Sequence, residues 1–459
     1  MARILPSLLK PTRIRTRLWQ AGVALAIFIL TMAIGNIFSP PEKAVTSDML
    51  GLDFLPFYAS GALARTGRAD LLYNIPAVAA FERETAKPLG MDLGKHFGPF
   101  WNPPFYAWVF APMSMLPYRQ ALAVWTMLNV AALGVSFVLL VRMLPKGTSW
   151  QSWMLVPLLM LVSIPFVQAI SHGQNTFTSL LLLCAAVTAW RSRKALWAGV
   201  FCGLLFYKPQ HAAVLGAVLT LSLGRRALLG FGGVVATLTL ITAVTMPGAM
   251  GDWLHRLPIN VHFMQVENPY NWERHATLKA FWRMLLQGHS TGEATPLVTL
   301  LTTLCTALAA VGLLSAISRC RSPFVDNVWT NETAAIRLDR LIVATVTATP
   351  LMMPFYFDYD LLLLAVPAVL FAGEMLSAIP GKPAAASDRW LIRSWALLFG
   401  TLLINGPLSH FIGIGLIAPP LALVAGFSIM RARRKPQKDH SPTRCAKEID
   451  AMLQPRKAA

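Results

Sequence analysis

Two carboxylates, Asp48 and Asp53, follow an apolar stretch that ends near Phe38. Asp53 has the apolar neighbours Leu52 and Phe54, so water is expected to be partly excluded from its carboxylate. A partly desolvated carboxylate is suited to act as a general base, because the charged form is disfavoured relative to water. An Asp that precedes a helix can instead cap the helix N-terminus, and both roles fit the local sequence.

A short polar connection between two apolar segments contains His172, Gln174 and Asn175. The two side-chain amides offer paired hydrogen-bond donors and acceptors, which suit the hydroxyl groups of a sugar. The alternative is a simple polar turn with no ligand.

Lys208 stands at the end of another apolar segment, in the sequence Tyr207-Lys208-Pro209. Its ammonium group can meet an anion such as a lipid phosphate. Alternatively, its aliphatic stem lies along apolar surface and carries the charge to the membrane interface.

Asp358 and Asp360 flank Tyr359 in a turn between two later apolar segments. Carboxylates beside tyrosines can bind a sugar, a metal or a cation, or can cap a helix. Residues two apart do not share a helix face, so this pair alone is not expected to chelate a metal ion.

The elements that carry these residues are apolar runs that recur along the whole chain. The chain has 459 residues, of which 55% are hydrophobic and 13% are charged. A soluble domain carries about 25% charged residues, so the composition favours a chain solvated by lipid.

Apolar runs near the length of a bilayer crossing must be helical, because lipid satisfies no backbone hydrogen bonds. The sequence therefore predicts an all-α polytopic membrane protein, a bundle of about 12 transmembrane helices. The expected spans are 18–38, 120–141, 152–170, 176–190, 195–207, 211–224, 227–247, 296–317, 340–355, 361–377, 391–408 and 411–430.

The proline-rich segment 103–117 decides which side each later connection faces. If it does not cross the membrane, Arg191, Arg193 and Arg225 lie in the cytoplasm, as the positive-inside rule requires. The polar connections described above then lie on the outer, periplasmic side. The outer segments 39–119 and 247–296 mix aromatic and charged residues, which predicts interfacial helices. Residues 1–430 are expected to form one transmembrane catalytic domain, and residues 431–459 a disordered basic tail in the cytoplasm.

Several functions are disfavoured. The net charge of +19 does not indicate nucleic-acid binding, because the basic residues lie at the ends of apolar runs and in the two tails. The sequence has no phosphate-binding loop and no Cys/His spacing that fits zinc, so no cofactor and no metal are expected. None of the five cysteines falls in an expected outer segment, so no disulfide is expected.

Short motifs in a fixed order resemble those of glycosyltransferase family 87, whose members are integral-membrane enzymes of the GT-C fold class. The resemblance covers roughly residues 20–375. The motifs are Asp53-Phe54, FYASGALA at 57–64, Leu72-Tyr73, NPPF at 102–105, APMSMLPY at 111–118, Trp125, Asn129, GQN at 173–175, Lys208-Pro209 and PFYFDYD at 354–360.

This resemblance implies transfer of a sugar, often mannose, from a polyprenyl-phosphate donor to a lipid or glycan acceptor on the extracytoplasmic face. Enzymes of this fold class place an essential acid in the first outer loop, a position that falls on Asp53, with Asp48 as the second choice. Lys208 is then expected to meet the donor phosphate, and a single displacement is expected to invert the anomeric centre. Family members often carry Tyr where this chain has Asn102, which puts the contacts of that Tyr in doubt. Further substrate contacts are expected from Tyr58, Asn102, His172, Gln174, Asn175, Asp358 and Asp360.

Three other classes stay open. A ligase or polymerase type of enzyme would use a diphosphate-linked sugar and an outer loop rich in arginine, for which Arg256, Arg274 and Arg283 are available. A transporter or flippase would need polar residues near the bilayer midplane, whereas those of this chain gather at the outer ends of the spans. A non-catalytic scaffold would not need Asp53.

Overall fold

The computed structural model describes residues 51–93, 97–145, 163–325, 332–376 and 386–434, and these are mostly helical. Within them no strand forms, and one antiparallel bridge joins His275 to Phe357. Asp48, the expected span 18–38 and most of the expected span 152–170 lie outside the described residues.

The α-helices are α3 (Leu55–Arg65), α4 (Ile75–Ala86), α5 (Ala107–Phe110), α6 (Tyr118–Met143), α8 (Ile164–Ser171), α9 (Thr176–Arg191), α10 (Ala195–Leu204), α11 (Pro209–Leu223), α12 (Arg225–Thr245), α13 (Ala249–His262), α14 (Leu278–Gln287), α15 (Pro296–Val325), α16 (Glu332–Met352), α17 (Ala365–Leu376), α18 (Ala386–Ile412) and α19 (Ala418–Arg433). Shorter turns include η3 (Pro104–Tyr106), η4 (Met113–Met115), η5 (Leu205–Tyr207), a π-helical turn η6 (Phe263–Glu267), η7 (Trp272–Arg274) and η8 (Asp358–Leu364).

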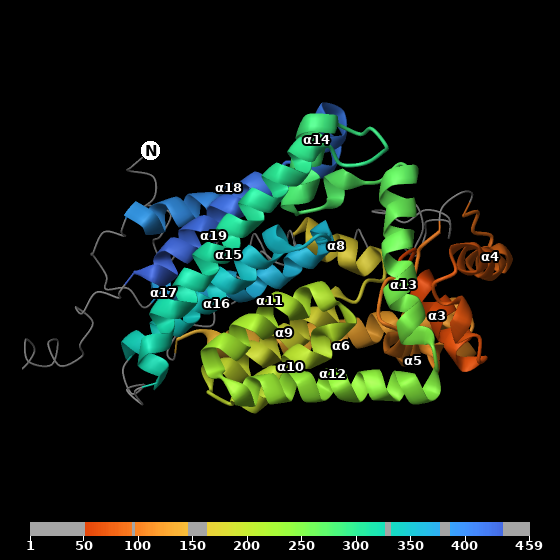
Figure 1. Cartoon of the computed structure of the whole chain (residues 1–459), viewed down its shortest axis with the longest axis horizontal. Helices are drawn as coiled ribbons and strands as arrows, with labels where there is room; N and C mark the ends of the chain where they lie inside the picture. Colours follow the sequence, from red (N-terminus) through yellow and green to blue (C-terminus); the bar gives the residue numbers. More distant parts are fainter. Residues whose placement is uncertain (1–50, 94–96, 146–162, 326–331, 377–385, 435–459) are drawn as a thin grey trace, which may run out of the picture.

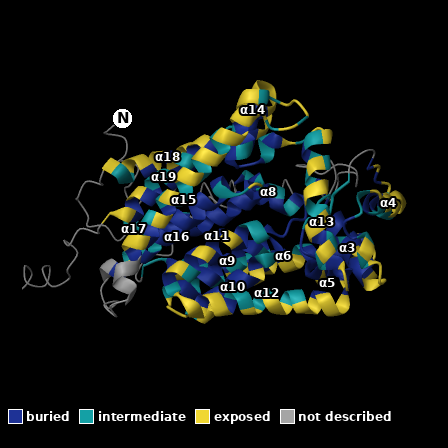
Figure 2. Ribbon diagram, viewed as in Figure 1, coloured by how far each residue is buried: buried dark blue, intermediate teal, exposed yellow. Residues whose placement is uncertain are grey.

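The long helices form two groups that lie side by side (Figure 1). Helices α6, α9, α10, α11 and α12 pack on one another, and α15 to α19 make the second group. Helix α16 joins the groups, because it packs on α15, α17 and α19 and also on α9 and α11. Its side chains are largely buried, whereas the outer helices expose many of theirs (Figure 2). The core of the molecule therefore runs along α16.

Among the described residues, four helices are long and apolar enough to cross a membrane. They coincide with the expected spans 120–141, 227–247, 296–317 and 391–408; three shorter apolar helical segments cover 176–191, 195–207 and 209–223. Large hydrophobic side chains stand exposed on the outer faces of these helices, for example Val244, which is 74% exposed, and Leu308, which is 71% exposed. Such faces suit a lipid environment, since no other described part of the chain covers them. A total of about 12 transmembrane helices remains a prediction.

Residues 103–117 do not form one continuous helix. They fold into three short helical pieces, η3, α5 and η4, which are largely buried beside α3. The contact is close because Gly61 of α3 has no side chain, and a Cβ atom there would collide with the backbone of Phe110. The prolines explain the breaks, since proline has no N–H group to continue a helix. Segment 103–117 therefore packs on α3 as a folded part of the protein and does not form a membrane-spanning helix of its own.

Small residues also set the packing of α10 on α12. A Cβ atom on Gly199 would collide with the carbonyl oxygen of Ala227, and one on Gly230 would collide with that of Leu196. Glycines that face each other in this way let two membrane helices approach closely.

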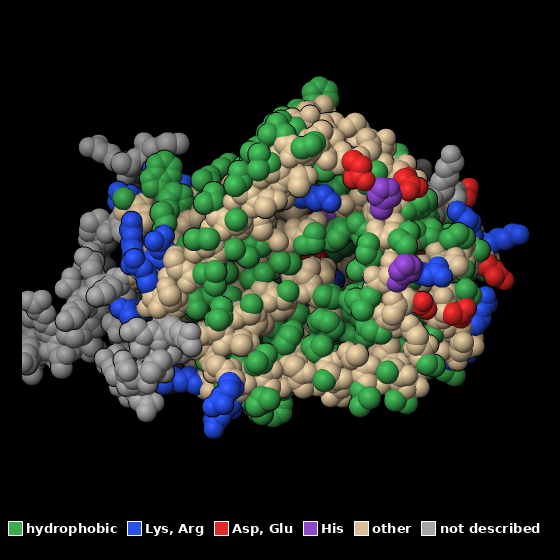
Figure 3. Space-filling view, viewed as in Figure 1, with side chains coloured by type: hydrophobic (Ala, Val, Ile, Leu, Met, Phe, Trp, Pro, Cys, Tyr) green, Lys and Arg blue, Asp and Glu red, His purple; other side chains and the backbone are tan. Residues whose placement is uncertain are grey.

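The two ends of the bundle differ in charge. Figure 3 shows Lys and Arg with hardly any Asp or Glu at the end near α17 and α19, and a mixture of Lys and Arg with most of the visible Asp, Glu and His at the opposite end near α13 and α3. At the basic end Glu374 pairs with Arg340 and with Arg431, whose Nε atom lies 2.8 Å from Asp388 Oδ1. Helix α19 extends to Arg433, beyond the expected boundary at residue 430, and buries Arg431 in this network. The rest of the expected tail, residues 435–459, lies outside the described residues.

Candidate active site

Asp53 lies just before α3, at the end of the bundle opposite the basic end, and is half-buried. Its N–H donates to the carbonyl oxygen of His172 over 3.0 Å, and its Oδ2 accepts from Gln174 Nε2 over 2.9 Å. The N-cap residue of α3 is Phe54, and no side chain caps this helix, so the capping role expected as an alternative is not observed. Among the described residues, no side-chain hydrogen bond reaches Asp53 Oδ1. One oxygen is thus held in place, and the other keeps its lone pairs for a ligand.

The turn that holds Asp53 depends on Gly173. This residue has a φ of +69°, and a Cβ atom there would lie 2.9 Å from Phe54 Cβ. Glycine adopts this left-handed conformation without strain, whereas other residues adopt it rarely. The Gly173 carbonyl also accepts from Trp125 Nε1 over 2.8 Å, which ties the turn to α6. The polar turn at residues 172–175 therefore holds the segment that carries Asp53 through hydrogen bonds that involve both its backbone and the Gln174 side chain.

Arg274 contributes the positive charge beside this turn. Its Nε and Nη2 atoms lie 3.4 and 3.3 Å from the carboxylate oxygens of Asp358, and Nη1 lies 3.4 Å from His172 Nε2. All three contacts are longer than usual, and the guanidinium also lies 5.8 Å from the ring centres of Phe357 and Tyr359. A guanidinium has five N–H donors, so some donors are left for a ligand. Asp53, His172, Gln174, Arg274 and Asp358 thus form one cluster, which we call the rim cluster.

The charges of the rim cluster act on one another. Burial alone would lower the pKa of Arg274, but the carboxylates of Asp358 and Asp53 outweigh it and the pKa is raised. Burial also lowers the pKa of His172, with Asp53 opposing and Arg274 adding to the effect. His172 is therefore neutral at pH 7. Its Nδ1 lies 3.0 Å from the Gln168 carbonyl, which can only accept, so Nδ1 carries the proton and Nε2 accepts from Arg274.

A second, buried cluster surrounds Asp360. Its Oδ1 lies 2.7 Å from Lys208 Nζ and accepts from Thr176 Oγ1 over 3.0 Å, while its Oδ2 lies 3.6 Å from His211 Nε2. Lys208 is only 7% exposed and Asp360 only 3%. Lys208 was expected to meet the donor phosphate, but here its charge already has a buried counterion. Thr176 links the two clusters, because it follows Gln174 by two residues.

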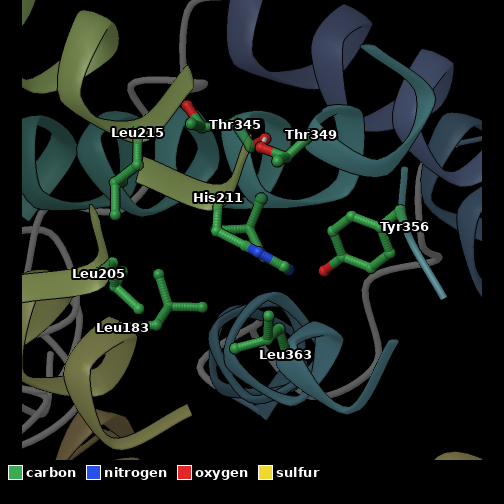
Figure 4. Close-up of a pocket in the computed structure, with 9 residues that line it drawn as sticks. Leu183, Leu205, His211, Leu215, Thr345, Thr349, Tyr356 and Leu363 are labelled. Atoms are coloured by element: carbon green, nitrogen blue, oxygen red, sulfur yellow. Dashed lines mark hydrogen bonds between the residues drawn. The ribbon is translucent and has the colours of Figure 1, made fainter. Parts of the chain in front are cut away.

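A small cavity of about 20 Å³ lies beside His211, between α9, α11 and α16. Its wall includes Thr345, Thr349 and Tyr356, and His211 and Tyr356 lie close together in it (Figure 4). Neither ring nitrogen of His211 makes a hydrogen bond to a described group. A cavity of this size holds about one water molecule, so it does not accommodate a sugar.

Replacing Asp360 with Ala is expected to destabilise the protein by about 3–5 kcal/mol, because the Lys208 ammonium would be left buried without a counterion. The measurement is the melting temperature of the purified protein in detergent. Lys208→Met combined with Asp360→Leu is the matched control and should recover most of the loss, since an apolar pair needs no compensation. An unchanged melting temperature for Asp360→Ala would mean that the pair is not buried.

Three further residues that were expected to contact substrate make internal contacts instead. The Tyr58 hydroxyl donates to the Leu116 carbonyl over 2.9 Å. The Asn102 amide donates to the Tyr207 carbonyl over 2.7 Å, which ties the first outer segment to the turn before Lys208. The Asn175 amide donates to the Tyr106 hydroxyl over 3.1 Å. All three lie around the rim cluster rather than in it, and their substrate contacts remain predictions.

Glu82 is a buried carboxyl group that sequence patterns did not single out. It lies on α4 with no exposed surface; Oε2 accepts from Gly98 N–H over 2.9 Å, and Oε1 has no partner among described groups. Burial raises its pKa from 4.5 to about 8, against the Gly98 hydrogen bond and the charge of Arg83, while Asp53 adds to the rise. Glu82 is therefore mostly protonated at pH 7.

Glu82→Gln is expected to remove a pH dependence of stability. The folded protein holds the Glu82 proton more tightly than the unfolded chain, so wild-type stability should fall as pH rises from about 4.5 to about 8. For one proton the slope is at most about 1.4 kcal/mol per pH unit. Melting temperatures measured from pH 5 to pH 9 should show a widening advantage for the variant that levels off above pH 8. The control is Glu84→Gln at an exposed neighbour, whose melting temperature should follow that of the wild type at every pH. If the melting temperature of Glu82→Gln also runs parallel to that of the wild type from pH 5 to pH 9, the raised pKa of Glu82 is refuted.

The site thus contains residues that the sequence analysis did not place there. Arg274 was considered only for a ligase or polymerase type of enzyme, and neither Thr176 nor His211 was considered. The partners of Arg274 and Lys208 come from segments 84 and 152 residues away. A cation that lies in an outer segment among aromatic residues is the only local signal that points to Arg274.

An apolar helical bundle with a half-buried carboxylate and a guanidinium at one end is the arrangement expected of a membrane-embedded enzyme. The model of glycosyltransferase family 87 matches residues 100–336, more than half of the chain, and the chain belongs to this family. It is therefore a membrane glycosyltransferase, and the resemblance drawn from its motifs is confirmed. No curated protein and no solved structure gives a significant match to it.

Proposed function

We propose that this glycosyltransferase moves a hexose, with mannose as the first candidate, from a polyprenyl-phosphate donor to a lipid or glycan acceptor. The observation that carries the proposal is the rim cluster, where the free oxygen of Asp53 and the spare donors of Arg274 lie within one electrostatic network. A sugar transfer from a lipid phosphate needs a base for the acceptor hydroxyl and a cation for the phosphate. The cluster offers one of each.

In the proposed reaction, Asp53 takes the proton of the acceptor hydroxyl as the oxygen attacks the anomeric carbon. The bond from that carbon to the phosphate oxygen breaks on the opposite face, so one displacement inverts the anomeric centre. The leaving polyprenyl phosphate keeps the electron pair, and Arg274 offsets the charge that develops on it. Gln174 keeps Asp53 in position throughout. No metal is required, because a monophosphate needs less charge neutralisation than a diphosphate.

Arg274 is a better candidate for the phosphate than Lys208. Lys208 is compensated at 2.7 Å by Asp360 and is almost fully buried, whereas the Arg274 side chain is 23% exposed and its contacts are long. A ligand anion can therefore replace Asp358 at Arg274 with little rearrangement. Asp358 and His172 would then be free to bind sugar hydroxyls.

The surface around the site suits a lipid-borne donor. Figure 3 shows a hollow beside α13 with hydrophobic side chains around it. A polyprenyl chain can lie against such a surface from the bilayer side, with its phosphate at the level of the polar end. By the positive-inside rule, the basic end with Arg340 and Arg431 is cytoplasmic, which supports a site on the periplasmic face of the inner membrane.

The test is a transfer assay in proteoliposomes. Purified protein is given polyprenyl-phosphate sugars labelled in the sugar, with membrane lipids and glycans as acceptors, and the anomeric configuration of the product is determined by NMR. Transfer with inversion from a monophosphate donor is the expected result. Transfer only from diphosphate-linked donors would favour the ligase or polymerase alternative, and movement of the lipid without transfer would favour a flippase.

A further inference from the structure

Asn405 is a buried polar residue in α18, one of the four helices that are long and apolar enough to span a membrane. Its side chain makes three hydrogen bonds: Nδ2 donates to the Glu273 carbonyl over 2.8 Å, and Oδ1 accepts from Ser409 Oγ over 2.7 Å and from Leu416 N–H over 3.2 Å. A polar side chain at such a place is costly unless it is satisfied, and residues of this kind often have a function. Asn405 lies outside the range matched by the family model.

The contact with Glu273 bears on the rim cluster because Glu273 directly precedes Arg274 in η7. On the other side of Arg274, Ala276 N–H donates to the Tyr356 carbonyl over 2.8 Å, next to the bridge between His275 and Phe357. The backbone is therefore anchored on both sides of Arg274. Among the described residues, the hydrogen bonds of the guanidinium are long, at 3.3–3.4 Å, and it also lies 5.8 Å from the ring centres of Phe357 and Tyr359, so the backbone anchors contribute to its place.

We propose that Asn405 is a positioning residue that fixes the backbone of η7 and thereby presents Arg274 to the donor phosphate. The proposal rests on the phosphate role of Arg274 given above. The competing explanation is purely structural, since Asn405 also ties α18 to the connection that leads into α19. Ser409 separates the two explanations, because its hydroxyl bonds to the same Asn405 side chain and, among the described residues, makes no hydrogen bond to η7.

The first experiment compares Asn405→Ala with Ser409→Ala in the transfer assay. Asn405→Ala is expected to lower kcat/KM for the donor by about 10- to 100-fold, chiefly through KM, because a displacement near 1 Å is costly at such a site. The KM for the acceptor should not change. Ser409→Ala should stay within about twofold of the wild type. If Asn405→Ala does not fold, Asn405→Asp keeps the shape and both acceptor contacts, and its ionised form cannot donate to Glu273.

The second experiment measures binding without catalysis, as the rise in melting temperature caused by undecaprenyl phosphate. Asn405→Ala should reduce this rise, and it should have no further effect when Arg274 is already Ala, because the two changes act through one contact. A protein that binds the lipid phosphate in this Asn405-dependent way but transfers no sugar would retain the positioning role and refute the proposed function. A lower melting temperature for Asn405→Ala with unchanged donor KM and unchanged lipid response would make Asn405 purely structural.

Discussion

Replacing Asp53 with Asn is expected to lower kcat for sugar transfer by about 10²–10⁴-fold, the usual contribution of a general base. Asn has the same shape and can still accept the hydrogen bond from Gln174 Nε2 through its own carbonyl oxygen. The backbone contact with His172 is also kept. The variant therefore removes the proton acceptor while the turn stays intact. The measurement is transfer from the labelled donor in proteoliposomes, with donor KM and melting temperature determined in parallel.

Asp70→Asn is the matched control for Asp53→Asn. Asp70 lies in the same outer segment, but it is exposed. Its change should leave transfer within about twofold of the wild type. Near-normal turnover by Asp53→Asn would remove Asp53 as the base. A large fall in melting temperature for Asp53→Asn would show instead that Asp53 mainly stabilises the turn through its hydrogen bond with Gln174.

Replacing Arg274 with Ala is expected to lower kcat/KM for the donor by about 10²–10³-fold, the effect of losing one strong donor to a developing anion. The donor KM should rise because a contact with the phosphate is lost, and kcat should fall because the charge on the phosphate grows as the glycosidic bond breaks. Arg274→Lys should recover only part of the activity, since an ammonium keeps the charge but lacks the planar fork of donors. Steady-state kinetics with varied donor at saturating acceptor measure both effects.

Arg256→Ala on α13 is the control for a lost positive charge in the same outer segment, and it should change donor KM by no more than about twofold. Lys208→Ala gives the decisive comparison. If Lys208 meets the phosphate, its loss will raise donor KM more than the loss of Arg274 does. If Arg274 meets the phosphate, Lys208→Ala will mainly lower the melting temperature, because it disrupts the buried pair with Asp360.

The membrane helices could be predicted because hydropathy is a local property. An apolar run must form a helix in lipid whatever its neighbours are, and the expected spans 120–141, 227–247, 296–317 and 391–408 match long helices. For the proline-rich segment 103–117, the sequence predicted from the positive-inside rule that it does not cross the membrane, and this stays a prediction. Helix α19 runs on to Arg433, past the expected domain boundary at residue 430, because the charged Arg431 stays in the helix through its pairs with Glu374 and Asp388.

The candidate site could be predicted only in part. The ordered motifs indicated the family and drew attention to Asp53, Gln174 and Asp358, which the structure brings into one cluster. They also indicated Lys208 as the phosphate ligand, and nothing in the local sequence reveals that Asp360, 152 residues away, neutralises it in the buried cluster. Arg274 was not considered for the phosphate role that we propose for it, since its partner Asp358 lies 84 residues further along the chain.

The sequence by itself thus determined that this chain is a helical membrane protein of glycosyltransferase family 87. Hydropathy and the family motifs are both properties of short stretches of residues and do not depend on how distant segments pack. Only the tertiary structure decided which cation keeps its charge available. A charge enclosed in a bundle must find a counterion, and the partner is chosen by how distant helices and loops pack. For this reason Lys208 has a close, buried counterion at 2.7 Å, whereas Arg274 has a longer and more exposed pair with Asp358, and we propose that Arg274 is the cation that binds the donor phosphate.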